Sequence, residues 1–309
     1  MGHQPWAPDG RLGRKLVSLA QFTDWGPWPT AHGQVLMTAW QLTGSLAPAS
    51  LAPARRELHA AVQLIAGAGS LLPPRADDSH TSMSWHDGSG FVGEPLSGEG
   101  MRVGLEPAKL VLWVLDTDLH PVDELRLGGR TLADARHWLG GALTGRVATR
   151  KAIGSIELPE ALSAERKADA AFVEHVEAVE LAAYYANANL LLARRASAGS
   201  PVRCWPHHMD IAVLLAGPHD GQTIGVGMSP GDSSYNEPYW YVTPWPHSGD
   251  FASQPLTGAG TWHSGNWVGA VLPSSRVRRH DAMTQYTQVS AFVASAIAAS
   301  RWVLKQVGG

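Results

Sequence analysis

Residues 203–217 read RCWPHHMDIAVLLAG, a run in which polar side chains precede an apolar segment of strand length. Side chains of a strand alternate between its two faces, so this pattern predicts that His207 and Ile211 share one face. His208 and Asp210 then share the other face. The apolar face is typical of a core, and the second face brings an imidazole and a carboxylate together at the mouth of the strand.

Strand-like segments recur on both sides of this run, grouped between helical segments and joined by short turns. Short turns between strands favour antiparallel pairing, since parallel strands need long crossovers. The sequence therefore predicts an α+β fold with antiparallel sheets. The predicted strands are HTSMSWH (80–86), MRVGLE (101–106), KLVLWVLD (109–116), DIAVLLAG (210–217), TIGVGM (223–228), PYWYVTPW (238–245) and NWVGAVLP (266–273).

Helical periodicity gives the order helix, strands, helix twice along the chain. This order predicts two similar halves, residues 1–150 and residues 151–309, each an antiparallel sheet flanked by helices. A long amphipathic helix joins them at the centre. A single compact domain is the alternative. The predicted helices are 30–46, 52–66, 131–143 with Thr131 as N-cap, 163–196 as the central helix, and 281–307.

Composition excludes several classes of partner. Charged residues make up 17% of the chain, the net charge is −3 and no run of like charge occurs, so neither nucleic acid nor an anionic membrane is expected as a partner. No stretch has the pattern of a signal peptide or a membrane span, which predicts a soluble, cytoplasmic protein acting on a small molecule. Because Cys204 is the single cysteine, metal ligands must come from His, Asp or Glu.

The pairing of His208 with Asp210 suggests two kinds of chemistry. With His263 as a third ligand, the pair predicts a site for a divalent metal ion of open identity. Without a metal, His208, Asp210 and Glu237 are candidate catalytic residues for acid–base chemistry. Either role predicts a small-molecule enzyme with its site in a cleft between the halves. The simpler alternative is a buried Asp210 held by backbone or tryptophan N–H groups.

Aromatic residues are the unusual feature of the composition, with thirteen tryptophans in the chain. Residues 234–248 read SYNEPYWYVTPWPHS, and alternation there places Trp240 and Tyr241 on opposite faces, so one of them is expected to face a pocket. The predicted pocket residues are Trp205, Trp240, Tyr241, Trp245 and His86. Such a pocket also fits a noncatalytic protein that binds a small ligand, so the sequence leaves open whether the chain is an enzyme.

A serine hydrolase is the third alternative, because residues 227–231 read GMSPG and match G-x-S-x-G. In hydrolases this motif joins a strand to a helix through a tight turn. Here turn residues lead into another strand, and Pro230 removes an N–H that an oxyanion hole would use. We therefore predict that Ser229 is not a nucleophile.

Five segments carry a resemblance that covers most of the chain. They are TAHGQVLMTAWQLTGSLAP (30–48), GMRVGLEPAKLVLWVLD (100–116), WPHHMDIAVLLAG (205–217), GMSPGDSSYNEPYWYVTPWP (227–246) and WVGAVLPSSRVR (267–278). In this order they resemble a bacterial family of domains of unknown function. The resemblance implies a shared fold and an aspartate at the position of Asp210. It implies no activity.

Overall fold

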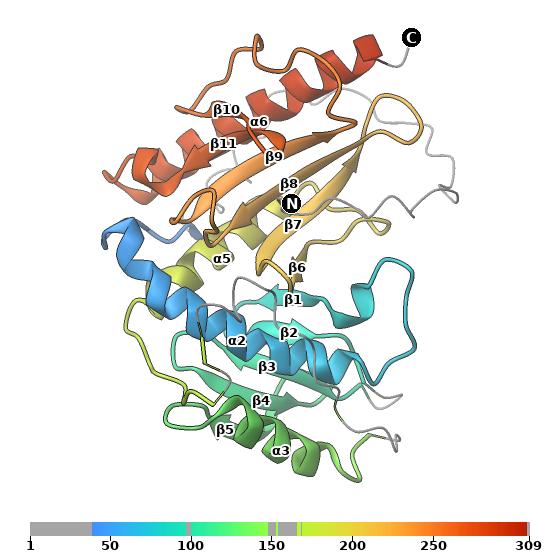
Figure 1. Ribbon diagram of the computed structural model, residues 1–309, viewed down its shortest axis with the longest axis vertical. Helices are drawn as coiled ribbons and strands as arrows, with labels where there is room; N and C mark the ends of the chain where they lie inside the picture. Colours follow the sequence, from blue (N-terminus) through green and yellow to red (C-terminus); the bar gives the residue numbers. More distant parts are fainter. Residues whose placement is uncertain (1–38, 97–99, 148–152, 154–165, 168, 308–309) are drawn as a thin grey trace.

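The strands form one open antiparallel sheet that runs through the whole molecule (Figure 1). In this computed structural model the described residues are 39–96, 100–147, 153, 166, 167 and 169–307. Within them the sheet has 11 strands in the order β10-β11-β9-β8-β7-β6-β1-β2-β3-β4-β5. All neighbouring strands are antiparallel, which confirms the predicted α+β class.

The helices and strands have the following bounds. The strands are β1 (Met83–His86), β2 (Gly90–Gly93), β3 (Arg102–Glu106), β4 (Val111–Leu115), β5 (Pro121–Arg126), β6 (Arg203–Trp205), β7 (Asp210–Ala216), β8 (Thr223–Ser229), β9 (Tyr239–Trp245), β10 (Thr261–Ser264) and β11 (Val268–Pro273). The described helices are α2 (Ala52–Gly69), α3 (Leu132–Leu143), α5 (Ala178–Leu192) and α6 (Ala282–Val307), with short 3-10 turns η1 (Pro48–Leu51), η2 (Ser79–Thr81) and η3 (Ser274–Arg276).

The two predicted halves do not form separate sheets. Strands β1 and β6, the first of each half, are neighbours at the centre, with Met83 opposite Cys204. The prediction of a separate sheet in each half is therefore wrong, because this pair joins the strands of both halves into one sheet. Similarity between the two halves stays a prediction.

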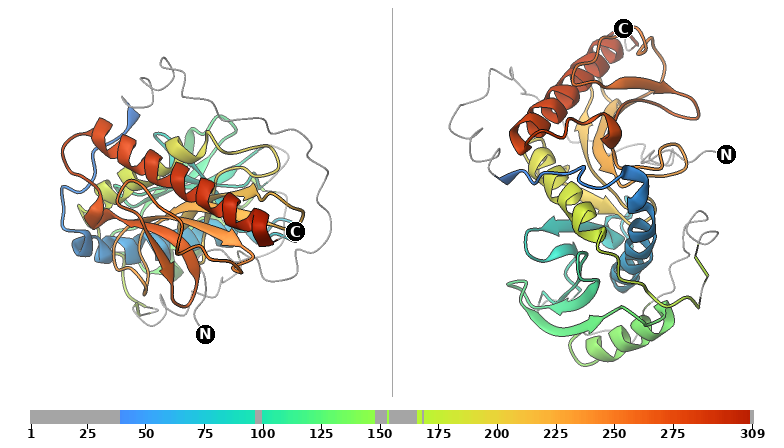
Figure 2. Two further views of the ribbon diagram at one scale, coloured as in Figure 1. Left: turned by 90° about the horizontal axis from the view of Figure 1, so that it is seen from above. Right: turned by 90° about the vertical axis from the view of Figure 1, so that its left-hand side faces the viewer.

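All four described helices pack on one face of the sheet. Helix α2 contacts β2 and β3, α5 contacts β7 and β8, α6 contacts β9 and β11, and α3 contacts β5. The register places Cys204, Ile211, Met228, Trp240 and Leu272 in one row across this face, and all five are buried. The sheet twists strongly along its length, as expected for an antiparallel sheet of this size, so the helices at its two ends point in different directions (Figure 2).

The opposite face carries the alternate residues and is more polar. Asp210, Gly227, Tyr239, Tyr241 and Thr243 all lie on it. Within the part of the chain that the structure describes, none of the helices packs on this face. We call it the open face.

Three of the predicted helices are confirmed with small shifts of their ends: α2, α3 and α6. Helix α3 begins with the predicted Thr131 cap, since the Thr131 hydroxyl accepts from the Asp134 N–H and the Asp134 carboxylate accepts from the Thr131 N–H. Such a capping box satisfies N–H groups that the first helical turn leaves unpaired.

We expect Thr131→Ala to lower the free energy of unfolding by about 1 kcal/mol, because the first turn of α3 loses this cap. Denaturant unfolding of the variant and the wild type measures the difference. Thr131→Ser, which keeps the hydroxyl, is the matched control and should retain most of the stability. Equal stability of the alanine variant and the wild type would contradict the capping role.

The predicted central helix is too long. Helix α5 begins only at Ala178, because the backbone of Phe172 pairs with the segment that precedes α3. The Phe172 N–H donates to the Arg130 carbonyl at 2.7 Å, and the Phe172 carbonyl accepts from the Gly129 N–H at 2.9 Å. The predicted helix over 30–46 lies outside the described residues up to residue 38. Of the remainder, Ala39 is helical but residues 40–46 are not, since the Gln41 N–H donates to the Asn187 side chain instead of to a helical carbonyl.

No described helix has the length and apolar character that a membrane crossing needs.

Candidate functional site

The candidate site lies on the open face at the end of the sheet where β7 begins, β8 ends and β9 begins. Its centre is Asp210, the first residue of β7, which is 1% exposed. Its Oδ2 atom accepts a hydrogen bond from the Tyr241 hydroxyl, while Oδ1 is buried and has no hydrogen-bond partner among the residues that the structure describes. Buried polar atoms are almost always paired, so an unpaired carboxylate oxygen is unusual.

Burial raises the pKa of Asp210, because the charged form loses its contact with water. The hydrogen bond from Tyr241 and the nearby His208 act in the opposite direction and do not cancel this rise. The carboxyl group is therefore easier to protonate than an exposed aspartate. Perturbed carboxyl groups of this kind are enriched at functional sites.

The contact between Tyr241 and Asp210 depends on Gly227. Tyr241 on β9 pairs with Gly227 on β8, and Gly227 pairs with Ala212 on β7, so the Tyr241 side chain must cross β8 to reach Asp210. A Cβ atom on Gly227 would lie 2.5 Å from the Tyr241 hydroxyl oxygen and 2.7 Å from the Ile211 carbonyl oxygen. Only glycine leaves room for the ring at this position.

A second tyrosine and carboxylate lie next to the first pair. The Tyr239 hydroxyl donates to Asp232 Oδ2 at 2.6 Å, and the rings of Tyr239 and Tyr241 are 6.1 Å apart. Burial, followed by the nearby carboxylates, raises the pKa of both tyrosines well above the usual value. Both hydroxyl groups therefore keep their protons and act as donors to the two carboxylates.

His208 is not part of strand β7, so the predicted alternation is wrong at this residue. Residues 206–209 form a turn in which Met209 has a left-handed φ of 54° and its N–H donates to the Trp205 carbonyl at 2.8 Å. This turn breaks the alternation, and His207, predicted to face the core, is exposed. From Asp210 onward the alternation holds, since Asp210 and Ala212 share the open face.

His208 still lies close enough to Asp210 and His59 to influence the pKa of both. The Nε2 atom of His59, on α2, is 3.0 Å from the Pro206 carbonyl oxygen. A carbonyl only accepts hydrogen bonds, so Nε2 carries the proton. Burial lowers the pKa of His59 to about 4, which keeps its ring neutral near pH 7. Sequence reasoning missed His59, because nothing local links a helical residue to this distant turn.

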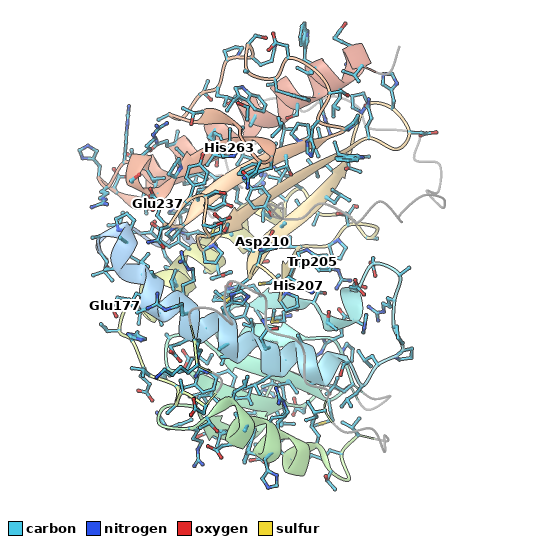
Figure 3. All side chains as sticks on the ribbon, in the orientation of Figure 1. Glu177, Trp205, His207, Asp210, Glu237 and His263 are labelled. Carbon is cyan, nitrogen blue, oxygen red and sulfur yellow. The ribbon has the colours of Figure 1, made fainter. Side chains whose placement is uncertain are left out.

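The predicted metal ligands are not brought together. His263 Nδ1 is 3.0 Å from the Tyr235 hydroxyl, its ring stacks on Trp267, and in Figure 3 it lies well apart from Asp210. Among the described residues no group of three or more His, Cys, Asp or Glu side chains is placed to hold a metal ion. The proposed set of His208, Asp210 and His263 therefore lacks a common centre.

Glu237 also lies away from Asp210 (Figure 3). Its carboxylate accepts hydrogen bonds from the Ser274 hydroxyl at 2.8 Å, the Ser275 N–H at 2.7 Å and the Ser275 hydroxyl at 2.9 Å. These contacts hold η3 against the start of β9. Glu237 thus stabilises this turn and does not lie beside the carboxyl group of Asp210.

The prediction that Trp240 or Tyr241 is accessible from a pocket is not met at either residue, because both are buried. Trp240 faces the helices and stacks on Trp40 with ring centres 5.8 Å apart, and Tyr241 is sealed on the open face. They do lie on opposite faces, as predicted, but each face is covered at that point. Trp245 at the far end of β9 is 42% exposed.

The two remaining pocket residues lie on the central strands. Trp205 on β6 is half-buried and lies opposite Asp210 in the register of β6 and β7. His86 on β1 is half-buried and lies 2.8 Å from the Ser84 hydroxyl. One small hollow lies elsewhere, beside Leu58, Pro107 and His175, and none of the predicted pocket residues lines it.

Ser229 lies at the end of β8 and is 1% exposed. Its hydroxyl oxygen accepts from the Gly231 N–H at 3.1 Å, and the chain continues through a turn into β9. Gly231 has a φ of 115°, which other residues rarely adopt. Each of the three residues that match the motif therefore has a structural explanation: Gly227 makes room for Tyr241, and Ser229 and Gly231 form the turn.

A fluorophosphonate probe is expected to leave Ser229 unlabelled, because its hydroxyl is buried and none of the described histidines is hydrogen-bonded to it. Intact-mass and peptide mass spectrometry measure the labelling, with Ser229→Ala as the control. Stoichiometric labelling that disappears in the control would show that Ser229 is a nucleophile after all.

The arrangement around Asp210 can transfer a proton or hold a polar ligand, and its geometry alone does not name a family. The likeness to a bacterial family of domains of unknown function stays a prediction. No family model, curated protein or solved structure matches this chain.

Proposed function

We propose that this chain is a small-molecule enzyme in which the carboxyl group of Asp210 donates or accepts a proton. The observation that carries the proposal is the buried Oδ1 atom, which has no partner within the described part of the chain while Oδ2 accepts from Tyr241. Leaving such an atom unpaired costs stability, about 1 to 3 kcal/mol, and such costs are commonly retained where a group serves function. Oδ1 is therefore the atom assigned to the substrate.

The surroundings of Asp210 favour the protonated form of its carboxyl group. Its raised pKa brings the carboxyl group closer to the pH at which a general acid or base works best. Tyr241 keeps its own proton and fixes the orientation of the carboxyl group through Oδ2. Protonated Asp210 would give its proton to a substrate atom through Oδ1 and regain one when the product leaves.

Substrate reaches Asp210 only if part of its cover moves. The segment directly before it is the turn of residues 206–209, which is held by the Met209 N–H and by two side chains on the Pro206 carbonyl, His59 and Gln63. We assign this turn as the part that opens. A loop that closes over the site would also exclude water from the reaction.

The proposal is tested by incubating the protein with a mixture of cellular metabolites and following each compound by mass spectrometry. We expect the wild type to consume at least one compound and Asp210→Asn to lose that activity. Asp220→Asn, which changes an exposed aspartate in the turn between β7 and β8, is the matched control and should retain it. No consumption by the wild type, or equal consumption by Asp210→Asn, would contradict an enzymatic role of Asp210.

A noncatalytic ligand-binding protein is the second candidate, and the closed state of the site favours it. Asp210, Tyr239 and Tyr241 are all buried. They can therefore support a ligand-binding surface from below without contacting the ligand themselves. In that case a metabolite should raise the melting temperature without being consumed. The rise should be the same in Asp210→Asn, which separates this candidate from the first.

A further inference from the structure

The outer part of the open face carries a second group of polar side chains. Arg276 in η3 is exposed and its guanidinium donates to the Thr261 hydroxyl on β10 at 3.3 Å. His263 lies two residues beyond Thr261 on the same strand, so both side chains point to the same face, about 7 Å apart along the strand. Tyr235, from the loop before β9, joins them through its contact with His263. Three segments of the chain thus converge here.

His263 is held in one orientation. Its ring stacks on Trp267 with ring centres 4.4 Å apart and an angle of 23° between the planes. Nε2 lies 3.3 Å from the Asn266 side-chain oxygen, an acceptor, so Nε2 carries the proton and Nδ1 accepts from the Tyr235 hydroxyl. Trp267 beneath it is buried, and its indole N–H has no partner among the described residues. An imidazole fixed in this way presents its N–H in a constant direction.

The carboxylates nearest to this group are already occupied. Asp232 accepts from the Tyr239 hydroxyl and from the N–H groups of Ser234 and Tyr235. Glu237 is taken by Ser274 and Ser275. Within the described part of the chain, none of the ion pairs involves Arg276. Most of the five N–H donors of the guanidinium are therefore available to bind a ligand.

We propose that Arg276, His263 and Tyr235 form a binding site for the oxyanion of a small molecule. A guanidinium binds a carboxylate or a phosphate through two parallel hydrogen bonds, and the His263 N–H adds a third by releasing the weakly held Asn266. Burial raises the pKa of Tyr235 and the charge of Arg276 opposes that rise, which agrees with the closeness of the two groups. The site shares no residue with the Asp210 centre and does not depend on an enzymatic role.

The test is a titration of protein labelled with 15N-histidine, in which the ring nitrogens of His263 are followed by NMR. The His263 signals are assigned with His263→Asn. Inorganic phosphate and acetate are added separately at constant pH and ionic strength, with chloride as the reference salt. We expect a saturable shift of the His263 signals with phosphate, with acetate or with both, and a stronger response to one of the two identifies the class of oxyanion.

Variants decide whether the shift reports this site. Arg276→Gln should weaken the binding at least about tenfold, because a charge-assisted hydrogen bond is lost. Arg278→Gln removes another exposed charge from the same loop and should leave the binding unchanged. Shifts that also occur with chloride, fail to saturate, or are equal in Arg276→Gln and the wild type would overturn the proposal.

Discussion

Replacing Gly227 with alanine is expected to lower the free energy of unfolding by about 3 kcal/mol, at the upper end of what overpacking of a core costs. The new methyl group would lie within 2.5 Å of the Tyr241 hydroxyl oxygen and within 2.7 Å of the Ile211 carbonyl oxygen. A side chain can rotate away, but the carbonyl belongs to the backbone of β7 and cannot move without disturbing the sheet. Denaturant unfolding measures the change, and loss of the Tyr241 contact should accompany it.

Gly140→Ala is the matched control for this substitution. Gly140 lies in helix α3 with nothing within 4 Å of the position of a Cβ atom, so alanine there should stabilise the protein by roughly 0.5 to 1 kcal/mol through its higher helix propensity. The two variants are expected to change stability in opposite directions. Equal stability of Gly227→Ala and the wild type would show that the ring of Tyr241 does not lie over β8.

Asp210→Asn is expected to reduce turnover by about 10²- to 10⁴-fold, the usual contribution of a general acid or base. The same substitution should raise the stability of the fold at pH 7. Burial raises the pKa of Asp210 in the folded state, so the folded protein binds the proton more tightly than the unfolded chain. The stability of the wild type therefore falls as the pH rises from the unfolded pKa, about 3.9, toward the folded pKa.

Asparagine has no charge to bury, so the variant should not show this fall. The stability difference between Asp210→Asn and the wild type is expected to grow with pH above about 4 and to level off above the folded pKa. Unfolding curves recorded over this pH range measure it. A variant that is both less active and less stable at every pH would indicate that Asp210 serves the fold rather than catalysis.

Much of the fold is predictable from local patterns. Strands β4, β7, β8, β9 and β11 are apolar or aromatic and bounded by turn residues, and the sequence predicts each within a few residues. Strand β5 was missed because PVDELR is polar and lies at the edge of the sheet, where only one side is paired. Strand β10, four residues at the other edge, gives an equally weak signal.

The joining of the halves into one sheet has no local signal, because it depends on the pairing of Met83 with Cys204, 121 positions apart. Asp210 was identified through alternation, which is a local property. The error at His208 came from a turn that begins where the apolar run suggested a strand, with Met209 in a left-handed conformation. A left-handed methionine is uncommon, so the sequence favours the extended alternative there.

The hydrogen-bond partner of Asp210 cannot be predicted from a local pattern, because it depends on the register of three strands. Tyr241 reaches Asp210 only because β8 lies between β7 and β9 and offers Gly227 at the crossing point. Gly227 is part of the G-x-S-x-G match, but its role is to make room for Tyr241 and not to form a nucleophile elbow. A glycine in the interior of a strand often marks the close approach of another group, and that signal identifies Gly227 more reliably than the hydrolase motif does.

The pKa of Asp210 itself is the quantity on which the proposed function depends most directly. It is measured by NMR on protein labelled with 13C at the aspartate carboxyl carbons, titrated with pH, with the Asp210 signal assigned by its absence in Asp210→Asn. We predict that this carbon titrates with a midpoint clearly above 3.9, the usual value for aspartate. A midpoint at or below 3.9 would mean that the buried carboxyl group is an ordinary stabilised anion, and would contradict its role in proton transfer.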